Sequence, residues 1–331
     1  MKKYRIGIQC GSLGERCGIY TYSMRLERYL NKMKEDKNGE KVDVEAYLFN
    51  ERAKKKTDLI NVQYEPGLMQ PQKFQNLINR YVVEPIVITV HHIGYLPSFY
   101  NAVDGFIFHS EDQVQNKPMD YATIQHPCLV YEDKDKTKLR KKYGLPLDKK
   151  ILGTAGFIVG TGKKLPYTVR EMLKRMNHDE FLYLTTSFWK AGDLGNKYDI
   201  MKAVEESGKE KQFRIDTDFV SDETLNEKLQ CCDLLWTWCA VGPNEKGSQS
   251  GIAADMYGTR RKLIVKDSAH YSYIGIQPKV EVGRVKPDDF ASDTLSLLRN
   301  GDLNDVQDPS WLSWEEKVKD YLDYFQLMLG E

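Results

Sequence analysis

Short apolar segments rich in β-branched residues alternate along the first half of the chain with longer segments whose apolar residues recur every three or four positions. The strand-like segments cover residues 4–9, 42–48, 59–64, 86–91 and 105–109, and the helical ones cover residues 20–33 and 71–81. This alternation is typical of βαβ units built on a parallel sheet. The first half therefore predicts an α/β domain.

The same alternation begins again near residue 150, after a basic segment that ends in Gly144-Leu145-Pro146. Strands are predicted at residues 151–155, 181–185, 212–215, 234–238 and 262–265, with helices at residues 166–176, 198–208, 222–230 and 250–257. Glycine and proline between two periodic regions mark a domain boundary. We therefore predict a first α/β domain over residues 1–145 and a second over residues 146–308.

The end of the chain carries one more helical pattern. Large apolar residues follow helical spacing between residues 311 and 329, namely Trp314, Val318, Tyr321, Leu322 and Phe325. Such a stripe predicts a long amphipathic helix that packs against a domain. Residues 309–331 are therefore treated as a separate C-terminal element.

Composition and charge narrow the classes of function. The 331 residues are 41% hydrophobic and 29% charged, which indicates a globular protein rather than a disordered or collagenous one. The 48 basic and 48 acidic residues cancel, which argues against nucleic-acid binding by bulk charge. Up to Gly144, however, 23 basic residues face 18 acidic ones, so an anionic partner would favour the first half.

The cysteines and the apolar segments indicate where in the cell the protein is expected to be. None of the six cysteines is paired as CxxC or spaced for zinc, so we expect reduced thiols and no metal site. No apolar segment is long enough to span a bilayer, and the first residues enter a strand without a signal-peptide pattern. We expect a cytoplasmic protein, with peripheral attachment to the inner membrane face through the basic residues 134–142 as an alternative.

In parallel α/β sheets, ligands bind beyond the carboxyl ends of the strands, so the residues after each strand are the candidates. The first strand is followed by a loop that contains Gly11, Gly14 and Gly18 and leads into a helix. It matches neither GxGxxG nor the Walker pattern, so a phosphate-binding loop and an ordinary glycine-rich turn both stay open. Later strands end at Glu65 and at His91-His92, side chains suited to acid, base or charge-stabilising roles.

Two loops of the second half have the composition of anion sites. The strand that ends at residue 155 is followed by Gly156, Lys163 and Lys164, just before Pro166 at a helix start. Glycines and lysines at a helix N-terminus suit a diphosphate. A second polar loop enters a helix at residues 250–255. Two such loops in one domain favour a nucleotide.

Taken in order, these segments resemble the GT-B glycosyltransferases, and among them the retaining family 4. Arg16-Cys17-Gly18-Ile19-Tyr20-Thr21-Tyr22 is similar to that family's first glycine loop, and Val62-Gln63-Tyr64-Glu65-Pro66-Gly67 to its VQHE-x-G segment. Val87-Ile88-Thr89-Val90-His91 resembles VVTLH, and Ser250-Gly251-Ile252-Ala253-Ala254-Asp255 the start of SGVLAEALA-x-G. The resemblance covers nearly the whole chain.

The resemblance implies two Rossmann-like domains that face each other across a cleft, with the terminal helix crossing back to the first. The first domain would serve the acceptor, and the second would bind a nucleotide diphosphate sugar such as a UDP- or GDP-sugar. A hexosyl or pentosyl group would move to an acceptor hydroxyl with retention and without a metal, since lysines and helix-terminal amides neutralise the diphosphate. The acceptor could be a glycan, a small molecule or a modified base.

The resemblance also implies roles for individual residues. His91 would lie near the donor sugar as a base or hydrogen-bonding group, Glu65 would orient the acceptor loop, and Asp255 stands where the family has a sugar-contacting Glu. Lys163 and Lys164 would neutralise the diphosphate, and Ser221 would lie near the nucleobase. The remaining expected contacts to phosphates or sugar are Gly14, Gly18, Gly156, Ser250, Gly251 and Ile252.

Departures from the family pattern keep other functions open. Gly247 replaces the first Glu of the E-x7-E motif, and Arg260 replaces a glycine. One alternative is therefore a GT-B protein that binds a nucleotide sugar or a partner without transfer. A second is transfer to a hydroxymethylated pyrimidine in DNA, which the positive first half would favour. A dehydrogenase or epimerase is disfavoured, because GxGxxG and an acidic residue about twenty positions later are both missing.

Overall fold

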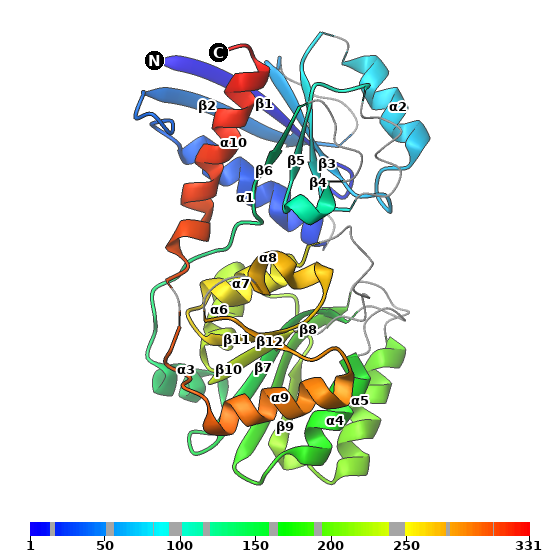
Figure 1. The fold of residues 1–331 in the computed structure, drawn as a ribbon, viewed down its shortest axis with the longest axis vertical. Helices are drawn as coiled ribbons and strands as arrows, with labels where there is room; N and C mark the ends of the chain where they lie inside the picture. The colour runs from blue at the N-terminus through cyan, green and yellow to red at the C-terminus, as the bar shows by residue number, and fades with distance from the viewer. Residues whose placement is uncertain are drawn as a thin grey trace. The chain divides into compact units, whose positions relative to one another are not determined.

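The computed structural model describes residues 1–13, 17–50, 56–81, 83–92, 101–114, 120–158, 165–188, 194–237, 249–275, 279–306 and 308–331. The chain divides into two compact units. The first consists of Met1–Pro127, Lys246–Gln249 and Trp311–Glu331, and the second of Cys128–Glu245 and Ser250–Ser310. Each unit is a parallel sheet with helices on both faces, as predicted (Figure 1).

The sheet of the first unit has the strand order β2-β1-β3-β4-β5-β6, and every neighbouring pair is parallel. The strands are β1 (Lys2–Cys10), β2 (Val42–Phe49), β3 (Leu59–Tyr64), β4 (Ile86–Val90), β5 (Gly105–Phe108) and β6 (Tyr121–Thr123). Successive strand residues point to opposite faces of a sheet. Ile60, Val62 and Tyr64 of β3 therefore share the face that α2 (Pro71–Arg80) covers with Phe74 and Leu77.

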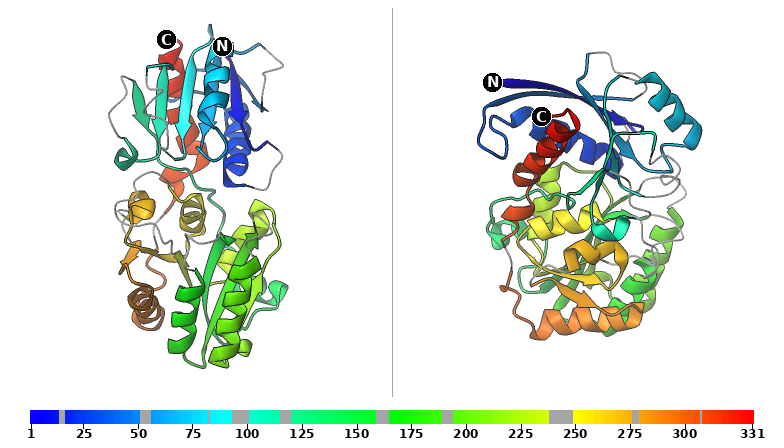
Figure 2. Two further views of the ribbon diagram at one scale, coloured as in Figure 1. Left: turned by 90° about the vertical axis from the view of Figure 1, so that its right-hand side faces the viewer. Right: turned by 45° about the horizontal axis from the view of Figure 1, so that its top comes forward.

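The opposite face of this sheet carries α1 (Gly18–Lys32) and the terminal helix α10 (Trp314–Met328), which pack against each other (Figure 2). Ser313 begins α10 as its N-cap, with its hydroxyl accepting from the Glu316 N–H at 3.2 Å. The predicted apolar stripe of α10 is buried. A Cβ on Gly105 would lie 2.4 Å from the Tyr324 hydroxyl, so only glycine lets α10 approach β5 this closely. The terminal helix therefore belongs to the first unit, as expected.

The sheet of the second unit has the order β12-β11-β10-β7-β8-β9, also parallel throughout. Its strands are β7 (Lys150–Ile158), β8 (Glu180–Phe188), β9 (Phe213–Asp216), β10 (Leu234–Thr237), β11 (Lys262–Lys266) and β12 (Glu281–Gly283). Its helices are α3 (Lys136–Tyr143), α4 (Leu165–Arg175), α5 (Leu194–Ser207), α6 (Asp222–Gln230), α7 (Gly251–Gly258), α8 (Ser272–Gly275) and α9 (Pro287–Asn300). Trp236, Met172 and Phe290 lie in the core between β10, α4 and α9.

Helix α3 and the two residues before it contain the basic segment that the sequence placed in the first domain. Arg140 pairs with Asp233 at 2.6 Å, and Lys134 pairs with Glu227 at 2.9 Å. These acids come from α6 and the residue before β10, so α3 packs into the second unit. The units accordingly divide after Pro127, whereas the sequence placed the boundary after residue 145. Four of the 23 basic residues counted up to Gly144 are thus paired with carboxylates of the second unit, namely Lys134, Lys136, Arg140 and Lys142.

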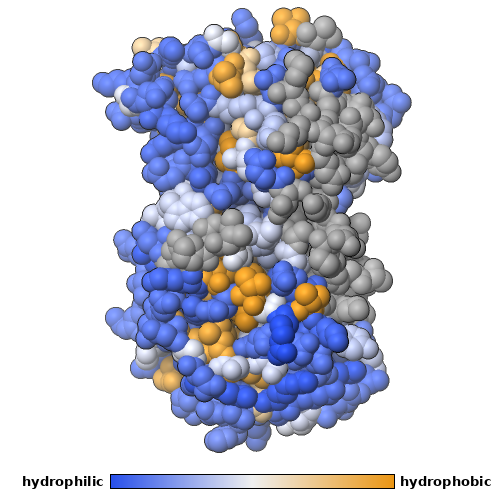
Figure 3. All heavy atoms as spheres, in the orientation of Figure 1, coloured by the Kyte–Doolittle hydropathy of each residue, from blue (hydrophilic) through white to orange (hydrophobic). Residues whose placement is uncertain are grey.

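The surface and the helices give two further observations. Most of the surface visible in Figure 3 is hydrophilic, with apolar atoms in small separate groups. Across the described ranges, no helix combines the length and the apolar character that crossing a membrane requires.

Candidate functional site

In the first unit, the carboxyl end of β1 leads through Ser12 to the start of α1. The Ser12 hydroxyl is buried and accepts a hydrogen bond from the Cys17 thiol at 2.8 Å. Cys17 is also the N-cap of α1, because its sulfur accepts from the Tyr20 N–H. A Cβ on Gly18 would meet nothing within 4 Å, so the first turn of α1 is open at this point. The predicted Gly14 lies outside the described residues.

The end of β3 presents Glu65 as a half-buried carboxylate. Its backbone carbonyl accepts from the N–H groups of Leu68 and Met69 at 3.0 and 2.9 Å, which holds the turn after the strand. Its carboxylate has no hydrogen-bond or ion-pair partner in the described part of the chain. It is therefore available to accept hydrogen bonds from a ligand.

The end of β4 separates the two adjacent histidines. His92 is exposed, whereas His91 is 9% exposed and its Nε2 lies 2.9 Å from the Gln63 Oε1. Burial, with smaller contributions from two neighbouring histidines, holds the pKa of His91 well below its usual value. His91 is consequently neutral at physiological pH, while His92 meets solvent.

Two histidines that the predicted site did not include lie beside His91. We call His91, His109 and His126 the histidine cluster; all three rings contact the Tyr22 ring of α1, at centroid distances of 4.8, 5.4 and 4.9 Å. Burial lowers the pKa of His109 to about 4 and that of His126 well below its usual value. His109 follows β5, a predicted strand, so reading every predicted strand end would have found it, whereas His126 follows β6, which the sequence did not predict. No group of three His, Cys, Asp or Glu in the described ranges could hold a metal ion.

In the second unit, the carboxyl end of β7 meets the start of α7. Gly156 has φ of +121°, which L-residues rarely adopt, and a Cβ there would lie 3.5 Å from the Ile252 side chain. Gly156 and Ile252, far apart in sequence, are thus neighbours. Lys163 and Lys164 lie outside the described residues.

Ser250 is the N-cap of α7. Its hydroxyl accepts from the Ala253 N–H at 3.4 Å, and its carbonyl accepts from the buried Tyr273 hydroxyl at 2.6 Å. The N–H groups of Gly251 and Ile252 are in the first helical turn and have no intrahelical acceptor. With the helix dipole, they favour an anion at this end of α7. Asp255 lies half-buried one turn later and, after burial, is the next cause that raises the pKa of Tyr273.

Ser221 and Arg260 have local structural roles. Ser221 is the exposed N-cap of α6, with its hydroxyl accepting from the Thr224 N–H at 3.2 Å. Arg260 follows α7 with φ of +58°, the left-handed region in which the family pattern has glycine. It pairs with Asp308 at 3.0 Å. The backbone turn that the glycine would make is therefore retained, although the residue differs.

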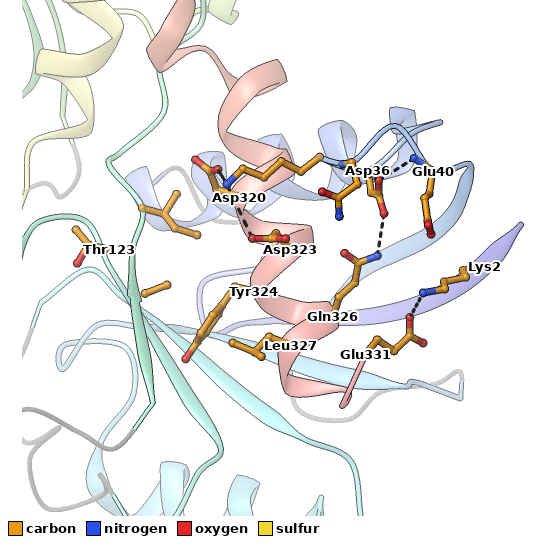
Figure 4. Close-up of a pocket in the computed structure, with 14 residues that line it drawn as sticks. Lys2, Asp36, Glu40, Thr123, Asp320, Asp323, Tyr324, Gln326, Leu327 and Glu331 are labelled. Atoms are coloured by element: carbon orange, nitrogen blue, oxygen red, sulfur yellow. Dashed lines mark hydrogen bonds and ion pairs between the residues drawn. The ribbon is translucent and has the colours of Figure 1, made fainter.

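A pocket of about 570 Å³ lies along α10 in the first unit (Figure 4). Its charged residues pair with one another: Lys2 with Glu331 at 3.0 Å and Lys37 with Asp320 at 3.1 Å. None of the predicted site residues lines this pocket. We therefore place the candidate site at the strand ends and not here.

No protein-family model and no curated protein sequence matches the chain. Solved structures do. A glycosyltransferase from Rickettsia africae has a TM-score of 0.71 and 11% identity, over 99% of each chain. Anabaena Alr3699/HepE in complex with UDP and glucose has a TM-score of 0.67 and 10% identity, over 98% of this chain and 95% of that one. The N-terminal domain of Candida albicans trehalose-6-phosphate phosphatase has a TM-score of 0.70 and 9% identity, over 97% and 96%.

The chain has the GT-B fold. At these identities the likeness shows the fold alone, and the third neighbour carries the name of a phosphatase. Within this GT-B fold, nearly all of the described site residues lie at strand ends or helix starts of their own unit, where α/β sheets bind ligands. In the first unit these are Gly18, Glu65 and His91, and in the second Gly156, Ser221, Ser250, Gly251 and Ile252, while Asp255 lies one turn into α7.

Proposed function

We propose that this protein is a glycosyltransferase that moves a sugar from a nucleotide diphosphate sugar to an acceptor hydroxyl. The observation that carries the proposal is the GT-B match, which extends over nearly the full length of both chains. The neighbour that holds UDP and glucose supports a UDP-sugar as the first donor to test. The sequence resemblance supports retention of configuration.

We propose that the second unit binds the donor. The start of α7 supplies the N–H groups of Gly251 and Ile252 beside Gly156, and a diphosphate there would be stabilised by the helix dipole. Lys163 and Lys164 would add positive charge, which makes a metal unnecessary for departure of the diphosphate. Asp255 would contact the sugar, and Ser221 would lie near the base.

We propose that the first unit serves the acceptor and the reacting sugar. The Glu65 carboxylate, which has no partner among the described residues, would accept hydrogen bonds from acceptor hydroxyls. His91 is neutral, so it would act as a hydrogen-bonding group or base and not as a cation. Gly14 and Gly18 would let the first loop approach the donor phosphate.

Thermal unfolding with UDP-, GDP-, ADP- and dTDP-sugars tests the donor. A ligand at a hundred times its dissociation constant should add about 2.7 kcal/mol to the free energy of unfolding. We expect a shift with one nucleotide series and its loss in Lys163→Ala. Lys174→Ala, which removes an exposed lysine paired with Glu171 in the same unit, should leave the shift unchanged. If no nucleotide sugar shifts the transition, the transferase proposal is wrong.

A GT-B protein that binds without transfer is the second candidate. Gly247 and the phosphatase-domain neighbour favour it. Binding of UDP-glucose with no glycosylated or hydrolysed product would establish this function. Transfer to DNA is less supported, because Lys136, Arg140 and Lys142 of α3 are paired with carboxylates within the second unit.

A further inference from the structure

Four polar side chains lie in a continuous line on the α1 face of the first sheet. Asn61 and Gln63 come from β3, Thr89 from β4 and His91 from its end, and their exposed fractions are 0, 1, 0 and 9%. The neighbouring strand residues on this parallel sheet are apolar, as buried strands usually are. Buried polar groups are stabilising only when hydrogen-bonded, so their directions of donation are fixed by their partners.

A backbone carbonyl at one end of the line fixes which atom of each hydrogen bond is the donor. The Val87 oxygen can only accept, so the group of Asn61 that lies 3.2 Å from it must be the Nδ2 amine. The Asn61 Oδ1 then faces Gln63 and accepts from its Nε2. This leaves the Gln63 Oε1 turned to the His91 Nε2 at 2.9 Å. Since that oxygen can only accept, the His91 proton is on Nε2.

The other ring nitrogen of His91 therefore carries a lone pair. Burial disfavours the charged ring, so Nδ1 stays unprotonated at neutral pH. Nδ1 has no hydrogen-bond partner among the described residues. The His109 Nε2 also has no partner among them, but it is fully enclosed, whereas the His91 Nδ1 is not. It is thus an open acceptor at the end of β4.

The other members of the histidine cluster have the opposite tautomer. The Nδ1 of His109 lies 3.0 Å from the Ile124 carbonyl, and that of His126 lies 3.0 Å from the Pro127 carbonyl. Because carbonyls only accept, both rings are protonated on Nδ1. Burial alone therefore does not decide the tautomer of these histidines. For His91 it is decided by Gln63.

We propose that Gln63 and Asn61 are positioning residues of the transfer reaction, which hold His91 in its Nε2–H tautomer so that Nδ1 accepts a hydrogen bond from a hydroxyl of the donor sugar. The inference rests on the proposed function. It names the chemistry that His91 recognises, an O–H donor on the sugar. An analogue that lacks this hydroxyl, or carries it as an ether, would lose the contact.

The first test reads the tautomer directly and needs no activity. In the full-length chain with 15N-labelled histidine, long-range NMR correlations distinguish protonated from unprotonated ring nitrogens, and loss of signals in His91→Asn assigns His91. We expect a protonated Nε2 and an unprotonated Nδ1. A His91 protonated on Nδ1 in the unsubstituted protein would overturn the proposal.

Two substitutions and a matched control test the role of Gln63. Gln63→Met removes the acceptor and should shift His91 to a mixture of tautomers or to Nδ1–H. Gln63→Glu keeps an acceptor and should retain Nε2–H, which gives a second result if Gln63→Met fails to fold. Gln9→Met makes the same change on β1, where the Gln9 amide donates to the Asn50 carbonyl at 2.8 Å, and should leave His91 unchanged. An unchanged tautomer in Gln63→Met would contradict the proposal.

The second test measures the contact to the sugar. Calorimetric affinities for UDP and for UDP-glucose separate the part of binding that the sugar adds. We expect Gln63→Met to weaken UDP-glucose by about 3- to 10-fold, the range of one net hydrogen bond, with UDP unchanged and Gln9→Met like the unsubstituted protein. Equal loss for both ligands would assign Gln63 a structural role only. If the unsubstituted protein binds neither UDP nor UDP-glucose, the donor proposal fails, while the NMR result still decides the tautomer.

Discussion

At the scale of single residues, two helix glycines have opposite surroundings. A Cβ on Gly258, in α7, would lie 2.1 Å from the Leu129 carbonyl oxygen, whereas one on Gly18, in α1, would meet nothing within 4 Å. Gly258→Ala must displace backbone, and we expect it to lower the free energy of unfolding by about 2 kcal/mol or more. Gly18→Ala should change it by less than about 1 kcal/mol. Urea unfolding measures both, and equal stability of the two variants would contradict this packing.

Gly18→Ala also separates folding from ligand binding. Its methyl group enters the open side of the first turn of α1, where the donor phosphate is proposed to approach. We therefore expect a folded variant with weaker UDP-sugar binding. Unchanged affinity would remove Gly18 from the proposed site.

At the scale of elements, the histidine cluster makes the packing of α1 sensitive to acid. The pKa values of His91, His109 and His126 are all lowered, first by burial, and that of His109 is about 4. The unfolded chain therefore binds up to three protons more than the folded one between about pH 4 and 6, so stability falls as pH falls. Three protons correspond to about 4 kcal/mol per pH unit. The charged and titratable groups that lie beside the histidine cluster are Arg25 and the Tyr22–Tyr321 hydroxyl pair.

Urea unfolding at several pH values checks this dependence. We expect the first unit to lose stability below pH 6. In His109→Gln, the slope of the free energy of unfolding against pH should be smaller by the equivalent of about one proton. The exposed His178 is the control, since His178→Gln should leave the slope unchanged. A pH-independent free energy of unfolding between pH 7 and 5 would contradict this prediction, because it would mean that the folded and unfolded chains bind the same number of protons over this range.

The second prediction at this scale concerns the stability that the ion pairs of α3 contribute. Asp233 accepts from Arg140 and from the Ile151 N–H at 2.7 Å, and Arg140 has a side chain only 7% exposed. Asp233→Asn would leave this buried guanidinium without its counter-charge, so we expect a loss of about 3 kcal/mol in urea unfolding. Glu206→Gln breaks an exposed pair with Arg170 and should cost less than about 1 kcal/mol. Similar losses in both variants would mean that the Asp233 pair contributes no more than a surface pair.

These elements also show what the sequence could and could not predict. Five strands of each sheet and the stripe of α10 were predicted, because buried apolar periodicity is a local property, whereas the three-residue strands β6 and β12 were not. Helix α3 was placed in the wrong unit, since the acids that hold it are about ninety residues away. His126 was missed because β6 has only three residues and gives no periodic signal. The roles of Glu65, His91 and Asp255 stay predictions.

At the scale of the whole molecule, the two units differ in how the chain builds them. The second is nearly continuous in sequence, and its ends lie together, with the Cys128 thiol 3.8 Å from the Pro309 carbonyl. The first depends on residues from both ends of the chain. In the first unit, the ring of Tyr22 packs on the ring of Trp314, with 4.9 Å between centroids, and the Tyr22 hydroxyl is hydrogen-bonded to that of Tyr321. Removing α10 therefore uncovers the face that holds the histidine cluster.

A pair of fragments tests this organisation. Residues 128–310 contain a complete parallel sheet and its helices, so we expect this fragment to unfold cooperatively in urea and to keep any shift that UDP produces in the full chain. Residues 1–127 lack α10 and leave apolar residues of α1 exposed, so we expect no cooperative transition from them. Adding residues 311–331 through a flexible linker should restore it. A folded 1–127 fragment would mean that α10 is not needed to close this core, and an unfolded 128–310 fragment would mean that the second unit depends on the first.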